Sequence, residues 1–192
     1  MSLSLDPATT ALIVIDLQRG IVARPAAPHS ANDVVARCAR LADAFRSQKA
    51  LVVLVHVAFS GDDRDRLKPE ADSAPPSGPT PADWSEIVPE IGPRPGDIVI
   101  TKRQWGAFYG TALDLQLRRR GIRTLVFGGI ATNFGVESTA RDAYERGFEQ
   151  LFVEDAMSGL TEDAHRFAIT TIFPRMGRIR STDDVLAAIT AR

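Results

Sequence analysis

The sequence is short of several features that would point to particular classes of protein. It contains a single cysteine, Cys38, among 192 residues, so no disulfide can form within the chain. This is typical of a reducing compartment. Basic and acidic residues number 23 and 24, which leaves a formal net charge of -1. Because nucleic-acid binding requires a basic excess, we predict no nucleic-acid partner.

Long apolar runs are missing as well. The longest, residues 11–15 and 51–55, are far too short to span a bilayer. The first nine residues lack the basic and apolar regions of a secretory signal. We therefore expect no membrane partner and a cytoplasmic location. The length suits one domain over residues 1–192.

Short apolar runs alternate with helical patterns along the chain. Buried strands are predicted at 11–15, 51–58, 97–101, 124–129, 149–154 and 178–180. Helices are predicted at 31–48, 111–120, 136–146, 161–173 and 181–189, and a long irregular segment at 60–96. This alternation predicts an α/β fold of three layers, α-β-α, with a mainly parallel six-stranded sheet.

Polar residues follow the first and third predicted strands directly. Asp16 comes after 11–15, and Lys102 comes after 97–101. The carboxyl ends of parallel strands share one edge of the sheet, where ligands bind, so this edge is the candidate site. A buried carboxylate there has a raised pKa and suits general acid or base catalysis. The alternative for Asp16 is a helix cap or surface turn, and for Lys102 a solvated side chain.

A glycine-rich segment, 128–135, joins the fourth predicted strand to the next helix. Three of its eight positions lack a side chain. Backbone N–H groups near a helix N-terminus can hold a developing negative charge. The alternative is a tight turn without a chemical role.

Three sequence blocks carry a resemblance to a known family. They are IVIDLQ at 13–18, TKR at 101–103 and GIATNFGVESTARDA at 129–143. They resemble the signature blocks of the isochorismatase-like (cysteine hydrolase) superfamily. The resemblance implies that family's Rossmann-like fold. It also implies that Asp16 and Lys102 are the first two members of an Asp-Lys-Cys catalytic triad whose third position is Gly135.

Gly135 determines which chemistry the resemblance allows. Cysteine hydrolases attack an amide carbon with their thiol, and glycine has no nucleophile. Cys38 cannot replace it, since it lies on the apolar stripe of the helix at 31–48. Isochorismatases of the family also lack the cysteine; by resemblance, Asp16 would protonate a vinyl ether carbon.

We therefore expect a hydrolase of a small anionic metabolite, with vinyl ether hydrolysis of isochorismate or a related compound as the model. One alternative is a catalytically silent relative that binds a small molecule or a partner protein. Another is an amide hydrolase that activates water between Asp16 and Lys102.

Several further residues are predicted to bind the substrate. The resemblance implies contacts from Gln18 and from the loop residues Ile130, Ala131, Thr132, Asn133 and Phe134, with a cis peptide between Ile130 and Ala131. Trp105, Phe108 and Tyr109 follow Lys102 closely. They could wall a pocket for a small ring or pack between subunits, since the resemblance implies a homo-oligomer.

No metal or other cofactor is expected. His29, His56 and His165 show no short ligand spacing. Some members of the superfamily bind a metal through an Asp-x-His arrangement, but here Leu54 stands two residues before His56.

Overall fold

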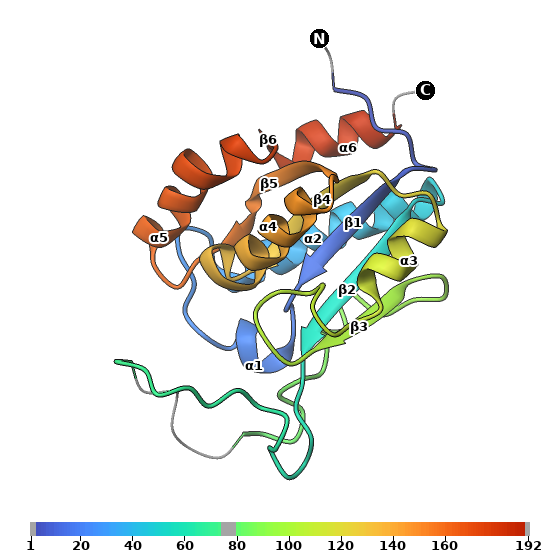
Figure 1. Ribbon diagram of the computed structural model, residues 1–192. Coiled ribbons are helices and arrows are strands. Elements are labelled where there is room, and N and C mark those ends of the chain that lie inside the picture. The colour runs from blue at the N-terminus through green and yellow to red at the C-terminus, as the bar shows by residue number, and fades with distance from the viewer. Residues whose placement is uncertain (1–2, 74–79, 191–192) are drawn as a thin grey trace.

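The computed structural model describes residues 3–73 and 80–190 (Figure 1). Its strands are β1 Thr10–Ile15, β2 Leu51–Val57, β3 Ile98–Lys102, β4 Thr124–Ile130, β5 Glu149–Ser158 and β6 Arg178–Arg180. Its α-helices are α1 Arg19–Val22, α2 Ala31–Ser47, α3 Leu113–Arg119, α4 Glu137–Glu145, α5 Glu162–Phe167 and α6 Thr182–Thr190. No helix of the described residues is long and apolar enough to cross a membrane.

The six strands form one parallel sheet in the order β3-β2-β1-β4-β5-β6. This confirms the predicted α/β fold. The chain runs outward from β1 to β3, then returns to the other side of β1 to continue with β4. The loops after β1 and β4 therefore leave the sheet in different directions. Ligands of such sheets bind in the crevice that this divergence opens.

Two apolar cores cover the two faces of the sheet. Successive side chains of a strand point to opposite faces, so Ile13 of β1 joins one core and Val14 the other. The core around Val14 includes α2 and α6, and the core around Ile13 includes α3 and α4. This double burial explains why β1, β2 and β4 are nearly continuous apolar runs rather than alternating ones.

Local capping signals place several helix ends as predicted. The hydroxyl of Ser181 accepts from the Asp184 N–H at 3.1 Å, and the Asp184 carboxylate accepts from the Ser181 N–H at 3.0 Å. This reciprocal pair is the predicted capping box at the start of α6. Gly121 follows α3 with φ +65°, the left-handed conformation expected after a helix.

The structure corrects other predicted boundaries. The helix predicted at 136–146 begins at Glu137, after a π-helical turn at Thr132–Val136. The helix predicted at 161–173 is α5, then a second π-helical turn at Ala168–Ile172 and a 3-10 turn at Phe173–Arg175. Strand β5 runs four residues beyond the predicted end, and the short α1 was not predicted. Of the segment 60–96, residues 74–79 lie outside the described residues; the remainder forms no helix or strand.

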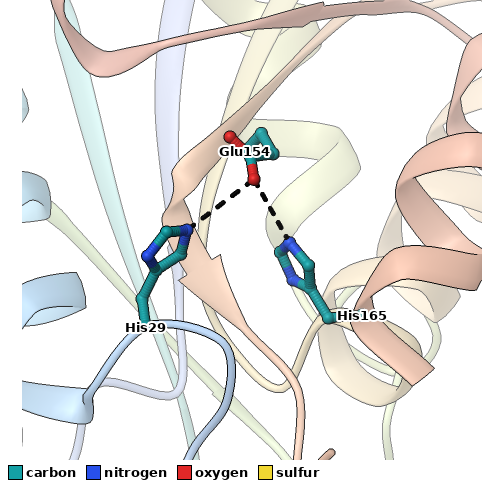
Figure 2. Close-up of side chains that lie close together, drawn as sticks. All are labelled: His29, Glu154 and His165. Carbon is teal, nitrogen blue, oxygen red and sulfur yellow. Dashed lines mark ion pairs between the residues drawn. The ribbon is translucent and has the colours of Figure 1, made fainter. Parts of the chain in front are cut away.

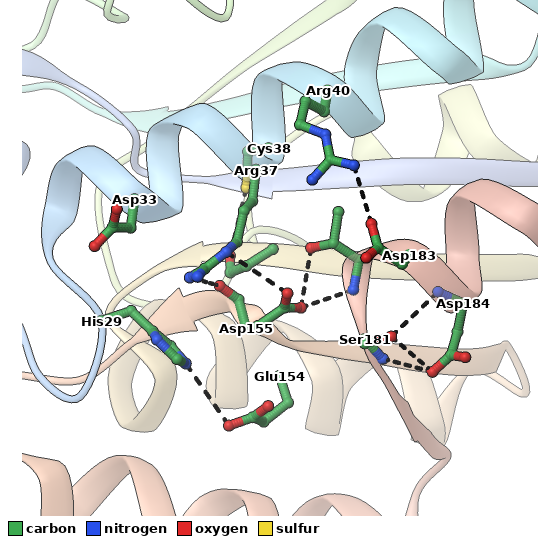
Figure 3. Close-up of polar contacts among 12 residues, drawn as sticks. His29, Asp33, Arg37, Cys38, Arg40, Glu154, Asp155, Ser181, Asp183 and Asp184 are labelled. Atoms are coloured by element: carbon green, nitrogen blue, oxygen red, sulfur yellow. Dashed lines mark hydrogen bonds and ion pairs between the residues drawn. The ribbon is translucent and has the colours of Figure 1, made fainter.

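A polar network ties α2 and α6 to the carboxyl half of β5 (Figure 3). Arg37 of α2 donates to the carbonyl oxygen of Asp155 at 2.7 Å. The Asp155 carboxylate accepts from the Thr182 N–H at 2.7 Å, and Arg40 pairs with Asp183 at 2.9 Å. The two bonds to Asp155 fix this segment of β5, including the neighbouring residue Glu154.

Candidate active site

Asp16 and Lys102 meet at the carboxyl edge of the sheet. The Nζ of Lys102 donates to Oδ2 of Asp16 at 2.7 Å and to the carbonyl oxygen of Trp105 at 2.6 Å. The prediction that the two side chains lie within hydrogen-bond reach is confirmed. Because β2 separates β1 from β3, Lys102 spans one strand to reach Asp16.

Both members of this pair are buried. Lys102 is 1% exposed and Asp16 is 6% exposed. Asp16 has φ +54°, an uncommon conformation for a residue with a side chain, and its N–H donates to the Val55 carbonyl at 2.8 Å. Backbone strain of this kind is often found at functional sites.

Burial determines the protonation of Asp16. Loss of solvent raises the pKa of this carboxyl group from 3.8 to about 6, against the opposing effects of Lys102 and His56. Only Oδ2 is bonded, to Lys102; Oδ1 is buried without a hydrogen-bond partner among the described residues. Oδ1 is therefore the oxygen available to carry a proton.

Gly135 faces the Asp16–Lys102 pair. A Cβ built on Gly135 would lie 2.9 Å from Oδ2 of Asp16 and 3.0 Å from Nζ of Lys102. A side chain at this position would therefore point between the carboxylate and the ammonium group. The three positions that the family resemblance brought together are neighbours in space, and the third of them carries no reactive atom.

The loop after β4 begins with a cis peptide between Ile130 and Ala131, as predicted. The N–H groups of Phe134 and Val136 both donate to the carbonyl oxygen of Ala131, at 3.1 and 3.3 Å. These two groups are therefore occupied in the loop and are not free to bind an oxyanion. The hydroxyl of Thr132 is also occupied, at 2.9 Å from Nδ1 of His165.

Four of the residues predicted to bind substrate have side chains in the interior, as Asp16 and Lys102 do. Gln18 is fully buried, and its amide bonds the backbone of Val57 at 2.9 and 2.8 Å and the carbonyl of Trp84 at 3.2 Å. Because these bonds occupy both ends of the amide, Gln18 holds the segment around Trp84 against β2. The other three are Ile130 and Phe108, which pack in the cores, and Thr132, which is fully buried.

The remaining predicted contacts lie nearer the surface. Trp105 is 63% exposed, and its ring packs edge-on against Phe134 with centroids 4.9 Å apart. Tyr109 is 78% exposed, and Ala131 and Asn133 are partly buried. The aromatic pair lies beside the buried site, because the carbonyl of Trp105 accepts from Lys102.

Two hollows of the surface lie away from this pair. One, of about 430 Å³, is lined by residues such as Ala8, Arg46 and Arg120. The other, of about 450 Å³, lies between α1 and the segment around Trp84. Neither is lined by Asp16, Lys102 or Gly135.

Two other groups of polar residues were not included in the candidate site predicted from the sequence. His56 lies close enough to Asp16 to lower its pKa, and its ring bonds the Ser85 carbonyl and the Thr101 hydroxyl at 2.7 and 2.8 Å. His29, Glu154 and His165 gather in a second cluster (Figure 2). Burial lowers the pKa of His165, against the opposing charge of Glu154. The segments of this cluster are far apart in the chain, so spacing gave no signal.

Comparison with known proteins identifies the family of the chain. The family model described as the isochorismatase domain matches residues 10–184. The uncharacterised isochorismatase family protein YwoC of Bacillus subtilis is 49% identical over 98% of each chain. The ureidoacrylate amidohydrolase RutB of Methylobacterium radiotolerans is 35% identical over 88% of this chain and 75% of its own.

Solved structures agree with the family comparison. An isochorismatase family protein from Burkholderia thailandensis superimposes with a TM-score of 0.94 and 48% identity over the whole of both chains. The N-carbamoylsarcosine amidase of Thermoplasma acidophilum superimposes with a TM-score of 0.71 and 27% identity, over 91% of this chain and 97% of its own.

Proposed function

The chain belongs to the isochorismatase family of hydrolases, and from this premise we propose that it hydrolyses the vinyl ether of a small anionic metabolite without a nucleophilic cysteine. The observation that carries the proposal is the raised pKa of Asp16, together with the absence of a nucleophile at Gly135. The position that faces the pair holds no nucleophile, while the carboxyl group has a pKa of about 6 and one unbonded oxygen. Such a group serves as a general acid near neutral pH.

The proposed reaction begins with proton transfer from Asp16 to the terminal carbon of an enolpyruvyl ether. The resulting oxocarbenium ion accepts water at the ether carbon, and the water gives one proton back to the Asp16 carboxylate and keeps the other as the hydroxyl of a hemiketal. The hemiketal then collapses to pyruvate and an alcohol, as this hydroxyl proton passes to the departing ether oxygen. Every atom comes from the ether and one water molecule, and no covalent intermediate with the protein forms.

Lys102 has a separate role in this scheme. An ammonium group has three donors, and the Asp16 carboxylate and the Trp105 carbonyl occupy two of them. The third is left for the carboxylate of the enolpyruvyl group. That contact would weaken the hold of Lys102 on Asp16 and so favour the protonated acid when substrate is bound.

Amide hydrolysis is the second candidate, and the names of two relatives support it. RutB of Methylobacterium radiotolerans is called an ureidoacrylate amidohydrolase, and the solved Thermoplasma acidophilum structure is an N-carbamoylsarcosine amidase. In this chain the attack would fall to water between Asp16 and Lys102, because Gly135 cannot form an acyl intermediate. A silent relative that binds a small molecule or a partner remains the third candidate.

The test is pyruvate release from isochorismate, coupled to lactate dehydrogenase, with wild type and Asp16→Asn. We expect turnover by the wild type and a loss of about 10²–10⁴-fold or more in the variant, since a general acid contributes that much. Substrate binding should persist, because asparagine keeps the shape of the side chain. Absence of pyruvate release from isochorismate and other enolpyruvyl ethers would defeat the proposal, and activity on amides instead would establish the second candidate.

A further inference from the structure

His29, Glu154 and His165 come from three separate parts of the fold and converge on one point (Figure 2). His29 lies on the loop before α2, Glu154 on β5 and His165 on α5. The Nε2 atoms of both rings lie 3.7 Å from the same oxygen of Glu154. One ligand atom from each residue lies within 4.8 Å of the other two.

Hydrogen bonding within the cluster does not account for this geometry. A separation of 3.7 Å is longer than an N–H···O hydrogen bond, which spans about 2.7–3.2 Å. Both Nε2 atoms are buried and have no hydrogen-bond partner among the described residues. Two unsatisfied ring nitrogens directed at one carboxylate oxygen are costly unless something lies between them.

The spacing fits a bound metal ion. Zinc binds histidine nitrogen at about 2.0–2.1 Å and carboxylate oxygen at about 2.0–2.2 Å, in tetrahedral geometry. Ligand atoms of such a site lie roughly 3.3–3.5 Å apart. The two separations of 3.7 Å therefore need only a small contraction, and the two histidine ligand atoms, which lie within 4.8 Å of each other, must approach by up to about 1.5 Å.

We propose that His29, Glu154 and His165 form a site for a divalent transition-metal ion of the zinc type, with three protein ligands and a fourth position for water. Imidazole and carboxylate ligands suit zinc and its neighbours in the transition series. The side chain of His165 is 4% exposed and that of Glu154 is 40% exposed. The open side of the site is therefore at Glu154, where solvent can supply the fourth ligand.

The surroundings hold the ligands in place. Nδ1 of His165 lies 2.9 Å from the hydroxyl of Thr132. With a metal on Nε2, the ring proton lies on Nδ1 and donates to this hydroxyl. Histidines that bind a metal commonly donate their other ring N–H to a neighbouring acceptor in this way. On the other side, Ser158 of β5 bonds the backbone of His29, with distances of 3.1 Å to its N–H and 2.7 Å to its carbonyl oxygen.

The site lies behind the loop that carries Gly135. Thr132, which contacts His165, opens the π-helical turn whose fourth residue is Gly135. A bound metal would join the loop before α2, strand β5 and helix α5, and would fix the Thr132 hydroxyl at the start of this turn. Its role is therefore to position the loop, and the reaction proposed above does not pass through it.

The experiment uses the full chain without a polyhistidine tag, freed of metal by chelation and titrated with Co²⁺ and then Zn²⁺. We expect one Co²⁺ per chain, with visible bands typical of four- or five-coordinate cobalt, displaced by Zn²⁺. Zinc should raise the melting temperature. His29→Ala and Glu154→Gln change partly exposed side chains. Each should weaken metal binding by more than about 100-fold, because loss of a residue that only supports a ligand costs about 10–100-fold.

His56→Gln is the matched control, because it removes the third histidine, whose ring is already bonded to Ser85 and Thr101. It should bind one Co²⁺ as the wild type does. Circular dichroism of each variant shows whether it is folded. The proposal is overturned if the folded wild type binds no Co²⁺ or Zn²⁺ at micromolar concentrations, if both ligand variants bind as it does, or if His56→Gln abolishes binding. All of these readouts are independent of any activity.

Discussion

The carboxyl group of Asp16 changes its charge near physiological pH, because burial outweighs the effect of Lys102 on its pKa. The reaction proposed here needs the protonated form. With a pKa of about 6, about half of the molecules carry the proton at pH 6, and well above this pH the protonated fraction falls about tenfold for each pH unit. Asp16 would act as a general base only above this pKa, where its carboxyl group is ionised.

We therefore expect kcat/KM for pyruvate release to be highest below about pH 6 and to fall as the pH rises through that value. The measurement is the coupled assay across pH 5 to pH 8. Lys102→Met removes the charge that lowers the Asp16 pKa, so the pKa should rise. The activity of this variant should be weaker than that of the wild type and should decline at a higher pH. An activity that increases with pH over this range would mean that Asp16 acts as a carboxylate.

Gly135 offers a second test at the scale of single residues. The wild-type thiol of Cys38 is fully buried, and burial raises its pKa to about 12, so we expect iodoacetamide to modify it slowly. In a Cys38→Ser background, Gly135→Cys places a thiol beside Lys102. Its pKa should be lowered by the ammonium group, so this variant should react much faster.

Close contacts set the cost of that substitution. The new Cβ would lie 2.9–3.0 Å from Asp16, Ile15 and Lys102, so side chains must shift by a few tenths of an ångström. We expect a loss of about 1–3 kcal/mol in the free energy of unfolding. Cys38→Ser alone is the control and should give no rapid adduct. Rapid modification of wild-type Cys38, or an inert thiol in the Gly135→Cys variant, would contradict the geometry.

At the scale of elements, the contact between β1 and β4 depends on Gly129. A Cβ at this position would lie 2.1 Å from the carbonyl oxygen of Ile15, and Gly129 has φ +124°, which strains any other residue. Gly129→Ala should therefore lower the free energy of unfolding by about 3 kcal/mol or more, as measured by urea denaturation.

Gly61→Ala is the matched control for this measurement. No atom lies within 4 Å of the Cβ that it would add, so its effect should stay within about 0.5 kcal/mol. Equal stability of the two variants would show that β1 and β4 tolerate a wider separation than the structure has.

Sequence patterns predicted the elements better than the contacts between them. Residue patterns predicted all six strands, and the signal was clearest for β1, β2 and β4, whose apolar runs are packed on both faces. The π-helical turn before α4 was not predicted, since its shape depends on the tertiary contact between Thr132 and His165. Periodicity likewise gave no sign that the helix beginning at Glu162 breaks after Phe167.

The sequence likewise predicted only part of the candidate site. Position after a strand was sufficient to pair Asp16 with Lys102. The burial of Gln18 and Phe108 was not predicted, because neither pattern nor motif tells which way a side chain points. The cluster around Glu154 was missed because its members are brought together by the fold alone.

At the scale of the whole molecule, two large aromatic rings remain uncovered near the site. Trp105 is 63% exposed and Tyr109 is 78% exposed. The helix after Gly135 offers one exposed ring, Tyr144 at 55%, because Ala140 and Ala143 of α4 already pack in the core of their own chain. The exposed rings after β3 are therefore the better candidates for a subunit interface, where aromatic residues are enriched.

We expect the wild type to sediment as a dimer or larger oligomer at micromolar concentrations, with Trp105 and Tyr109 in the interface between copies of the chain. The double variant Trp105→Ser, Tyr109→Ser should shift towards the monomer, since aromatic anchors contribute most of the binding energy of many interfaces. Leu67→Ser is the control, because Leu67 is similarly exposed, at 70%, on a different segment. A double variant that stays oligomeric would place the interface elsewhere. A monomeric wild type would contradict the prediction and would leave both rings free to contact substrate over Lys102.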